Sequence, residues 1–159
     1  MAKFPENSVM RTSKEFSNRI KDLIEDNECL SNKEFAELIG VSSQVIIKAA
    51  DFGIIPTTKT LIKIADKLDL SLEYLLGISE ENDFIGSNSP SDFYTRVREL
   101  AEEKNLTIGG VASKMSFART YFYVWEKKKT LPLLEYAIEI ARFFSVSLDY
   151  LLGRSDYKN

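Results

Sequence analysis

The sequence predicts an all-α protein built from two tandem copies of one five-helix unit, joined by a short linker. Three observations predict this fold class: an internal repeat at an offset of 76 to 77 residues, apolar residues at helical spacing in each copy, and a segment rich in Ser, Asn, Asp, Gly and Pro between them. We place the first unit at residues 13–78, the linker at 79–90 and the second unit at 91–154.

The repeat appears in matched segments at both ends of each copy. Phe16 and Phe93 open similar stretches at an offset of 77, whereas SLEYLLG, ending at Gly77, and SLDYLLG, ending at Gly153, match at an offset of 76. The second copy has therefore lost one residue, which we assign to the turn near residues 27–30, because loops tolerate such changes.

The apolar spacing inside each copy is helical rather than alternating. Leu61, Ile64, Ala65 and Leu68 fall at i, i+3, i+4 and i+7, so one helix face is apolar and the predicted core is helix packed on helix. No segment has the pattern of a strand. The predicted helices span residues 13–27, 32–39, 43–51, 58–68 and 72–76 in the first unit, and 91–104, 108–115, 118–127, 133–144 and 148–152 in the second.

Hydroxyl side chains mark the starts of several of these helices. Ser31 and Thr107 precede the second helix of each unit, and Ser71 and Ser147 precede the fifth. A hydroxyl at this position accepts a hydrogen bond from a backbone N–H that has no partner within the helix. We therefore predict these four residues to be N-caps.

Composition argues against an enzyme. The chain has no histidine, which removes the commonest general base at neutral pH and the commonest zinc ligand. We therefore expect no catalytic residues, no cofactor and no metal. The single cysteine, Cys29, and the lack of a membrane-spanning or secretory segment point to the cytoplasm.

The net charge of −3 confines any nucleic-acid site to a local patch. Residues 14–77 carry 8 Lys and Arg against 11 Asp and Glu, whereas residues 91–159 carry 11 against 9. The second unit is thus the better candidate for binding phosphates.

The stretch from Leu30 to Ala50 resembles the helix-turn-helix of the Cro/phage-repressor (XRE-like) family. Ala36, Gly40 and Ile46 stand at the small, turn and core positions of that motif, and Gly40 suits a turn that needs positive φ. The resemblance implies two lambda-repressor-like domains that bind double-stranded DNA, each with its third helix in the major groove.

The resemblance also assigns candidate DNA-binding residues, position by position. In the first unit Gln44 can pair with adenine and Lys48 can reach guanine or a phosphate, and in the second Arg119 has the same choice. The run of lysines after the third helix of the second unit suits phosphate neutralisation, although lysine runs are also common on solvated surfaces. The full set is Asn32, Ser42, Ser43, Gln44, Lys48, Arg119, Thr120, Tyr123, Lys127, Lys128 and Lys129.

The second unit departs from the family pattern in places. Gly109 and Gly110 follow its cap, which indicates either a frayed helix start or a close approach of backbone N–H groups to a phosphate. Among its third-helix aromatics, we expect Phe122 and Trp125 to be buried. We expect Glu126 to be solvated or engaged by a neighbouring lysine, because a buried lone charge is destabilising.

The first unit has apolar residues, from Phe52 to Ile55, where the second has its lysines, which suggests an interface with the other unit or a second chain. The leading hypothesis is a sequence-specific DNA-binding transcriptional regulator, repressor-like and of prophage or mobile-element type. It would act as a homodimer or as a pseudo-dimer within one chain. The alternative is a protein-interaction module, an anti-repressor or adaptor that has lost DNA binding.

Overall fold

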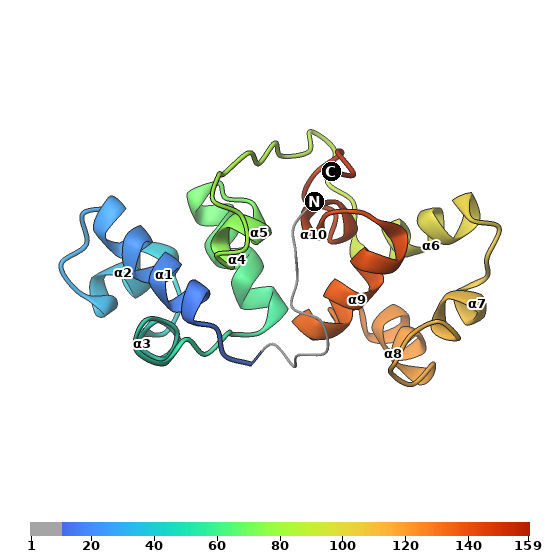
Figure 1. Ribbon diagram of the computed structural model, residues 1–159, viewed down its shortest axis with the longest axis horizontal. Helices are drawn as coiled ribbons and strands as arrows, with labels where there is room; N and C mark the ends of the chain where they lie inside the picture. The colour runs from blue at the N-terminus through green and yellow to red at the C-terminus, as the bar shows by residue number, and fades with distance from the viewer. Residues whose placement is uncertain (1–10) are drawn as a thin grey trace. The chain divides into compact units, whose positions relative to one another are not determined.

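A computed structural model describes residues 11–159 and divides them into two units, residues 11–84 and residues 85–159. Within this range there are ten α-helices and no strand, since the sole extended pairing is an isolated bridge between Thr12 and Ile54 (Figure 1). The all-α prediction is therefore confirmed. The helices are α1 Lys14–Asp26, α2 Asn32–Ile39, α3 Ser43–Phe52, α4 Thr58–Leu68, α5 Leu72–Leu75, α6 Phe93–Glu103, α7 Ile108–Ala112, α8 Thr120–Lys128, α9 Leu134–Phe144 and α10 Leu148–Leu151.

The hydroxyl caps predicted from the sequence are present. Ser31 accepts a hydrogen bond from Glu34 N and Thr107 from Gly110 N, and Ser71 and Ser147 cap α5 and α10 in the same way. Each cap gives a partner to one backbone N–H that has none within the helix. The capping hydroxyls stand at the same repeat positions in both units.

All five predicted helix ranges in the second unit differ from the observed helices at one end or both, and three of them are wrong by two residues or more. The helix predicted from residue 91 begins at Phe93, because the side chain of Asp92 accepts from Thr95 N and caps it. The helix predicted to residue 115 ends at Ala112, and the helix predicted from residue 118 begins at Thr120. The physical reason for both changes is the long turn described below.

Each unit has its own helical core. In the first, α1 packs on α3 and α5, and α2 packs on α3 and α4, around fully buried side chains such as Phe16, Phe35 and Ile46. In the second, α6 packs on α7 and α10, and α9 packs on α10, around residues such as Ile140 and Leu148. Both cores are mainly apolar, as the helical stripes predicted, and the second unit also buries the charged side chains of Arg96, Asp149 and Arg154.

The same arginine–tyrosine contact fastens the first helix to the last in both units. Arg19 lies over the ring of Tyr74 at 3.8 Å and donates to its carbonyl oxygen at 2.9 Å. Arg96 lies over the ring of Tyr150 at 4.1 Å and is 7% exposed. The matched arginines in the sequence repeat therefore have a structural role in holding each unit closed.

The apolar residues at the end of α3 and directly after it, 52–55, pack only in part. Ile54 pairs with Thr12, and Gly53 accepts from Ser13 N at 2.9 Å. Phe52 stays 69% exposed. The proposed interface at this segment remains a prediction.

None of the helices between residues 11 and 159 combines the length and apolar character that crossing a bilayer requires.

Candidate nucleic-acid interface

A tight turn joins α2 to α3 in the first unit. Gly40 ends α2 at φ +87, a left-handed conformation that glycine adopts without strain, and its N–H donates to Ala36 O at 2.8 Å. From α4, Lys63 Nζ donates to Gly40 O at 2.6 Å. A cation at the C-terminal end of a helix is favourable. Lys63 therefore fixes the turn and gives the exposed carbonyl oxygen of Gly40 a hydrogen-bond donor.

The inner face of α3 is firmly held by the rest of the first unit. Ile46, Ala49 and Ala50 are almost completely buried, and the hydroxyl of Ser17 on α1 donates to Ala50 O at 2.6 Å. Ser42 caps the helix by accepting from Val45 N. The orientation of α3 is therefore fixed by its buried inner face and by the cap at its start.

The outer face of α3 carries most of the candidate residues of the first unit. Ser42, Gln44 and Lys48 are exposed, whereas Ser43 and Asn32 are half-buried. Within the described part of the chain, no side-chain hydrogen bond or ion pair engages Gln44 or Lys48. Their amide and ammonium groups are thus available to a ligand.

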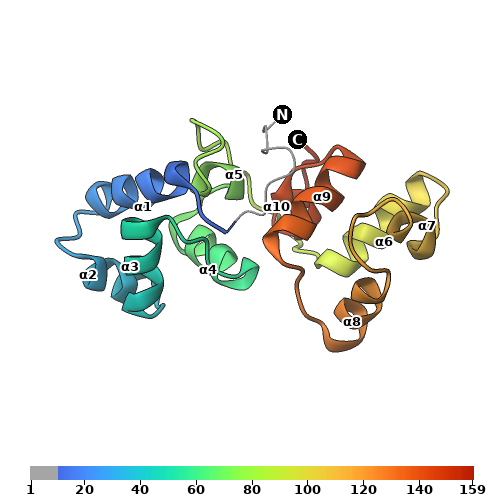
Figure 2. The ribbon, with the colours of Figure 1, turned by 60° about the horizontal axis from the view of Figure 1, so that its bottom comes forward.

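The second unit replaces the tight turn by a seven-residue segment, 113–119 (Figure 2). Its centre is fastened to α9, where Glu139 accepts from Ser116 N at 2.5 Å and from the Ser116 hydroxyl at 2.7 Å. At the offset of 76, Ser116 corresponds to Gly40 and Glu139 to Lys63. The same two repeat positions are therefore bonded in both units, but the side chain on α4 is a cation that donates, whereas the side chain on α9 is a carboxylate that accepts.

An aromatic cluster holds α8 in place. Phe117, from the long segment, lies 4.4 Å from Tyr136 and 5.6 Å from Trp125 between ring centroids, and Phe122 lies 5.1 Å from Trp125. Phe122 and Trp125 are 2% and 5% exposed, so their predicted burial is confirmed. Tyr121 packs on the edge of this cluster, with its ring centroid 5.3 Å from that of Tyr136.

The space above Gly109 is taken by an arginine. A Cβ on Gly109 would come within 2.9 Å of Nη2 of Arg119, which precedes α8 as its N-cap residue rather than lying inside the predicted helix. Of the two readings of these glycines, the frayed start is not observed, because α7 begins at Ile108 directly after its cap Thr107. The close approach of backbone N–H groups to a phosphate stays a prediction. Gly109 gives the exposed guanidinium room to lie against the start of α7.

The outer face of α8 is exposed at the remaining candidate positions. Thr120 and Tyr123 point to solvent, as does Val124, and Tyr123 is 66% exposed. Lys127, Lys128 and Lys129 are also exposed.

The lysine run is not neutralised by the carboxylate next to it in sequence. Glu126 is 44% exposed and pairs with Arg98 of α6 at 3.6 Å. Glu126 was expected to be solvated or engaged by a lysine; it is instead half-buried, and its partner is an arginine. The pKa of Tyr94 is raised by burial and by its hydrogen bond to Glu126, which gives that carboxylate a second contact.

Lys129 ends α8 in an unusual backbone conformation. Its φ is +55, and the corresponding residue of the first unit is Gly53, at φ +66. A side chain in this region costs roughly 1–2 kcal/mol. Its ammonium is close enough to Asp92 to help lower the pKa of that carboxyl, although the backbone N–H of Thr95 is the larger cause.

Sequence reasoning missed the two residues that support the turns, Lys63 and Glu139. A signal was present, because both stand at one repeat position with opposite charge. Their partners lie 23 residues away in each case, so only the folded structure identifies them.

Comparison with known proteins gives a distant partial relative. Over 61 residues, 38% of this chain, the sequence is 33% identical to the uncharacterized HTH-type transcriptional regulator YobD of Bacillus subtilis strain 168. The match covers 54% of that protein, so the chain spans about half the length of this relative. No family model matches the chain, and neither does any solved structure.

Proposed function

We propose that this protein is a non-enzymatic transcriptional regulator that binds double-stranded DNA through two lambda-repressor-like helix-turn-helix domains, residues 13–78 and 91–154. In this proposal it acts as a repressor of prophage or mobile-element type in the cytoplasm. The distant similarity to an HTH-type transcriptional regulator supports this function.

The observation that carries the proposal is the outer face of α3. Gln44 and Lys48 project from a helix whose inner face is buried and whose preceding turn is fixed by Gly40 and Lys63. A rigid helix with unengaged amide and ammonium groups fits the major groove, where glutamine recognises adenine and lysine recognises guanine or a phosphate. Ser42, Ser43 and Asn32 would add contacts to the sugar–phosphate backbone of the DNA.

The second unit would supply most of the phosphate contacts. Arg119 and the three lysines 127–129 form an exposed basic group at the two ends of α8, and Glu126 is already engaged by Arg98. Phosphate neutralisation makes binding strongly dependent on salt. Thr120 and Tyr123 lie on the exposed face of α8 between Arg119 and the lysines, and they would contact the sugar–phosphate backbone or a thymine methyl.

A second candidate function is a protein-interaction module, an anti-repressor or adaptor without DNA binding. Phe52, 69% exposed beside the exposed Asp51, is the observation that favours it, because large exposed apolar residues are frequent at interfaces.

A fluorescence anisotropy titration with a pool of random-sequence duplexes, repeated between about 50 and 200 mM salt, tests the proposal. We expect binding that weakens steeply with salt and is largely lost when lysines 127–129 are all changed to Glu. In a selection of bound duplexes from the same pool, Gln44→Ala should relax the preference at one position, at a loss of roughly 1–3 kcal/mol. Absence of duplex binding at low salt would favour the interaction module.

A further inference from the structure

The segment predicted to be a linker, 79–90, is bonded to the first unit at Asn82. The side-chain oxygen of Asn82 accepts from Ser71 N at 2.9 Å, and its side-chain nitrogen donates to Asp69 O at 3.0 Å. Both partners lie just before α5. Asn82 therefore marks a point at which the chain is still part of the first unit.

Ser87 is bonded to the second unit. Its N–H donates to Arg154 O at 2.9 Å, and its hydroxyl donates to Asp156 Oδ1 at 2.7 Å and accepts from Ser89 N at 3.0 Å. These bonds join the start of the second unit to the residues that follow α10. The two anchors, Asn82 and Ser87, are five peptide steps apart.

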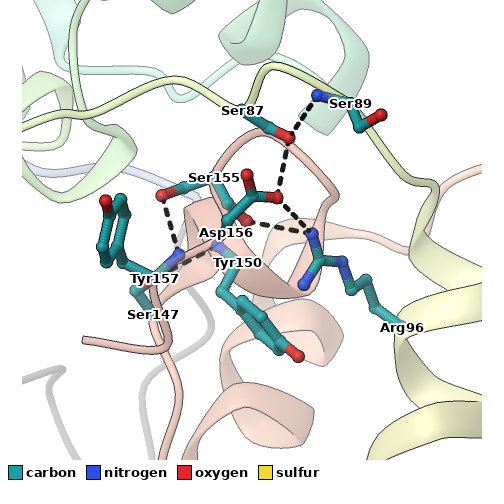
Figure 3. A network of polar contacts seen from close by, with 8 residues as sticks. All are labelled: Ser87, Ser89, Arg96, Ser147, Tyr150, Ser155, Asp156 and Tyr157. Carbon is teal, nitrogen blue, oxygen red and sulfur yellow. Dashed lines mark hydrogen bonds and ion pairs between the residues drawn. The ribbon is translucent and has the colours of Figure 1, made fainter.

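The Ser87 anchor rests on a buried group (Figure 3). The Asp156 carboxylate that accepts from Ser87 also pairs with Nη2 of Arg96 at 3.3 Å, and the same Nη2 donates to Ser155 O at 3.1 Å. Arg96 is itself held over Tyr150. We call the three residues Ser87, Asp156 and Arg96 the clamp.

The clamp limits the reach of the connection between the units. A fully extended chain spans about 3.6 Å per residue, so Asn82 and Ser87 are at most about 18 Å apart. Without the clamp, the next hydrogen bond to the second unit that the described residues show is that of Ser91 N to Gly153 O, nine steps from Asn82, and the upper limit rises to about 32 Å. The difference, about 14 Å, equals about four base pairs of duplex at 3.4 Å each.

We propose that the clamp sets which spacing of two half-sites a single chain can bind. The inference rests on the proposed function, with both units on one duplex. A short tether raises the effective concentration of the second unit at half-sites within its reach and removes that advantage beyond it. Ser87 and Asp156 are thus specificity-determining residues for the spacing, although neither belongs to the DNA-binding faces.

Two variants release the tether in different ways. Ser87→Pro combined with Asp156→Ala removes the N–H, the hydroxyl and the carboxylate of the clamp. Inserting Gly-Ser-Gly-Ser after Gly86 leaves the clamp intact. It lengthens the connection between Asn82 and Ser87 from five peptide steps to nine, the same number as in the first variant. Asn88→Ala, at an exposed residue beside the clamp, is the matched control. Ser87→Ala is a milder variant that keeps the backbone bond and leaves the apolar core untouched.

The measurement is the affinity for duplexes carrying the two selected half-sites with spacers lengthened one base pair at a time. We expect the wild type and Asn88→Ala to bind a narrow range, and both released variants to accept longer spacers, by at most about four base pairs because each added base pair also turns the second half-site around the duplex. Ser87→Ala should widen the range by less. If the insertion widens the range and the clamp variants do not, or if the wild type is indifferent to spacing, the inference is wrong.

A second readout needs no DNA. Spin labels on Cys29 and on a cysteine at exposed position 102 (Glu102→Cys) report the distribution of distances between the units. The distribution should broaden in both released variants, and an unchanged distribution overturns the clamp whatever the DNA result. Loss of all duplex binding by the wild type would instead refute the proposed function.

Discussion

Replacing Lys129 with glycine should stabilise the second unit while weakening its binding to DNA. The left-handed backbone of Lys129 costs roughly 1–2 kcal/mol with a side chain, and the greater chain entropy of glycine when unfolded offsets roughly 0.5–1 kcal/mol of the relief. Losing the attraction to Asp92 counts little, because water screens an exposed pair. We therefore expect a net gain of up to about 1.5 kcal/mol, or up to roughly 12 °C in Tm.

Thermal denaturation followed by circular dichroism measures the stability, and anisotropy across salt measures the binding. Removing one phosphate contact should reduce the slope of log K against log salt by about 0.9. Lys128→Ala is the matched control, since it removes the same charge from a helical residue without relieving strain. A Lys129→Gly chain less stable than the wild type would refute the strain argument, and an unchanged salt slope would refute the phosphate contact.

Three further predictions concern stability. Ser17→Ala should lower the free energy of unfolding by about 1–2 kcal/mol, measured in urea, because Ala50 O loses its buried partner. Asp149→Ala should lower it by about 3–5 kcal/mol, because the buried guanidinium of Arg154 loses its carboxylate. In the folded protein the pKa of Asp92 is lowered below its ordinary 3.8, mainly by the backbone hydrogen bond from Thr95. Its contribution to the free energy of unfolding is therefore present above pH 3.8 and is lost as the pH falls through the folded pKa. Asp92→Asn should flatten this pH dependence, measured as acid denaturation curves.

Local signals in the sequence were enough for most of the fold. The bounds of α2 and α4 match their predicted ranges, because a hydroxyl cap and an apolar stripe define each of them within a few residues. The exposure of Gln44 and Lys48 follows from the same periodicity. Whether these side chains contact DNA stays a prediction, because exposure alone does not specify a ligand.

The long turn of the second unit could not be predicted in this way. Repeat matching placed Arg119 inside a helix, but α7 ends three residues earlier than its counterpart and α8 begins one residue later. The contacts responsible are distant in sequence: Phe117 enters the aromatic cluster with Tyr136, and Ser116 is bonded to Glu139. A window of a few residues contains none of these partners, so helix propensity was overridden by tertiary contacts.

Gly40 with Lys63 and Ser116 with Glu139 are two chemically matched pairs at the same repeat positions. A cation on helix four suits a turn that exposes a carbonyl oxygen, whereas a carboxylate suits one that exposes an N–H and a hydroxyl. Exchanging Lys63 alone for Glu would place a carboxylate beside the Gly40 carbonyl oxygen, and neither group could donate to the other. The first unit thereby has a positive charge at the turn before α3 and the second a negative one at the segment 113–119. Under the proposed function, attraction for phosphates would then come from the lysines at the far end of α8.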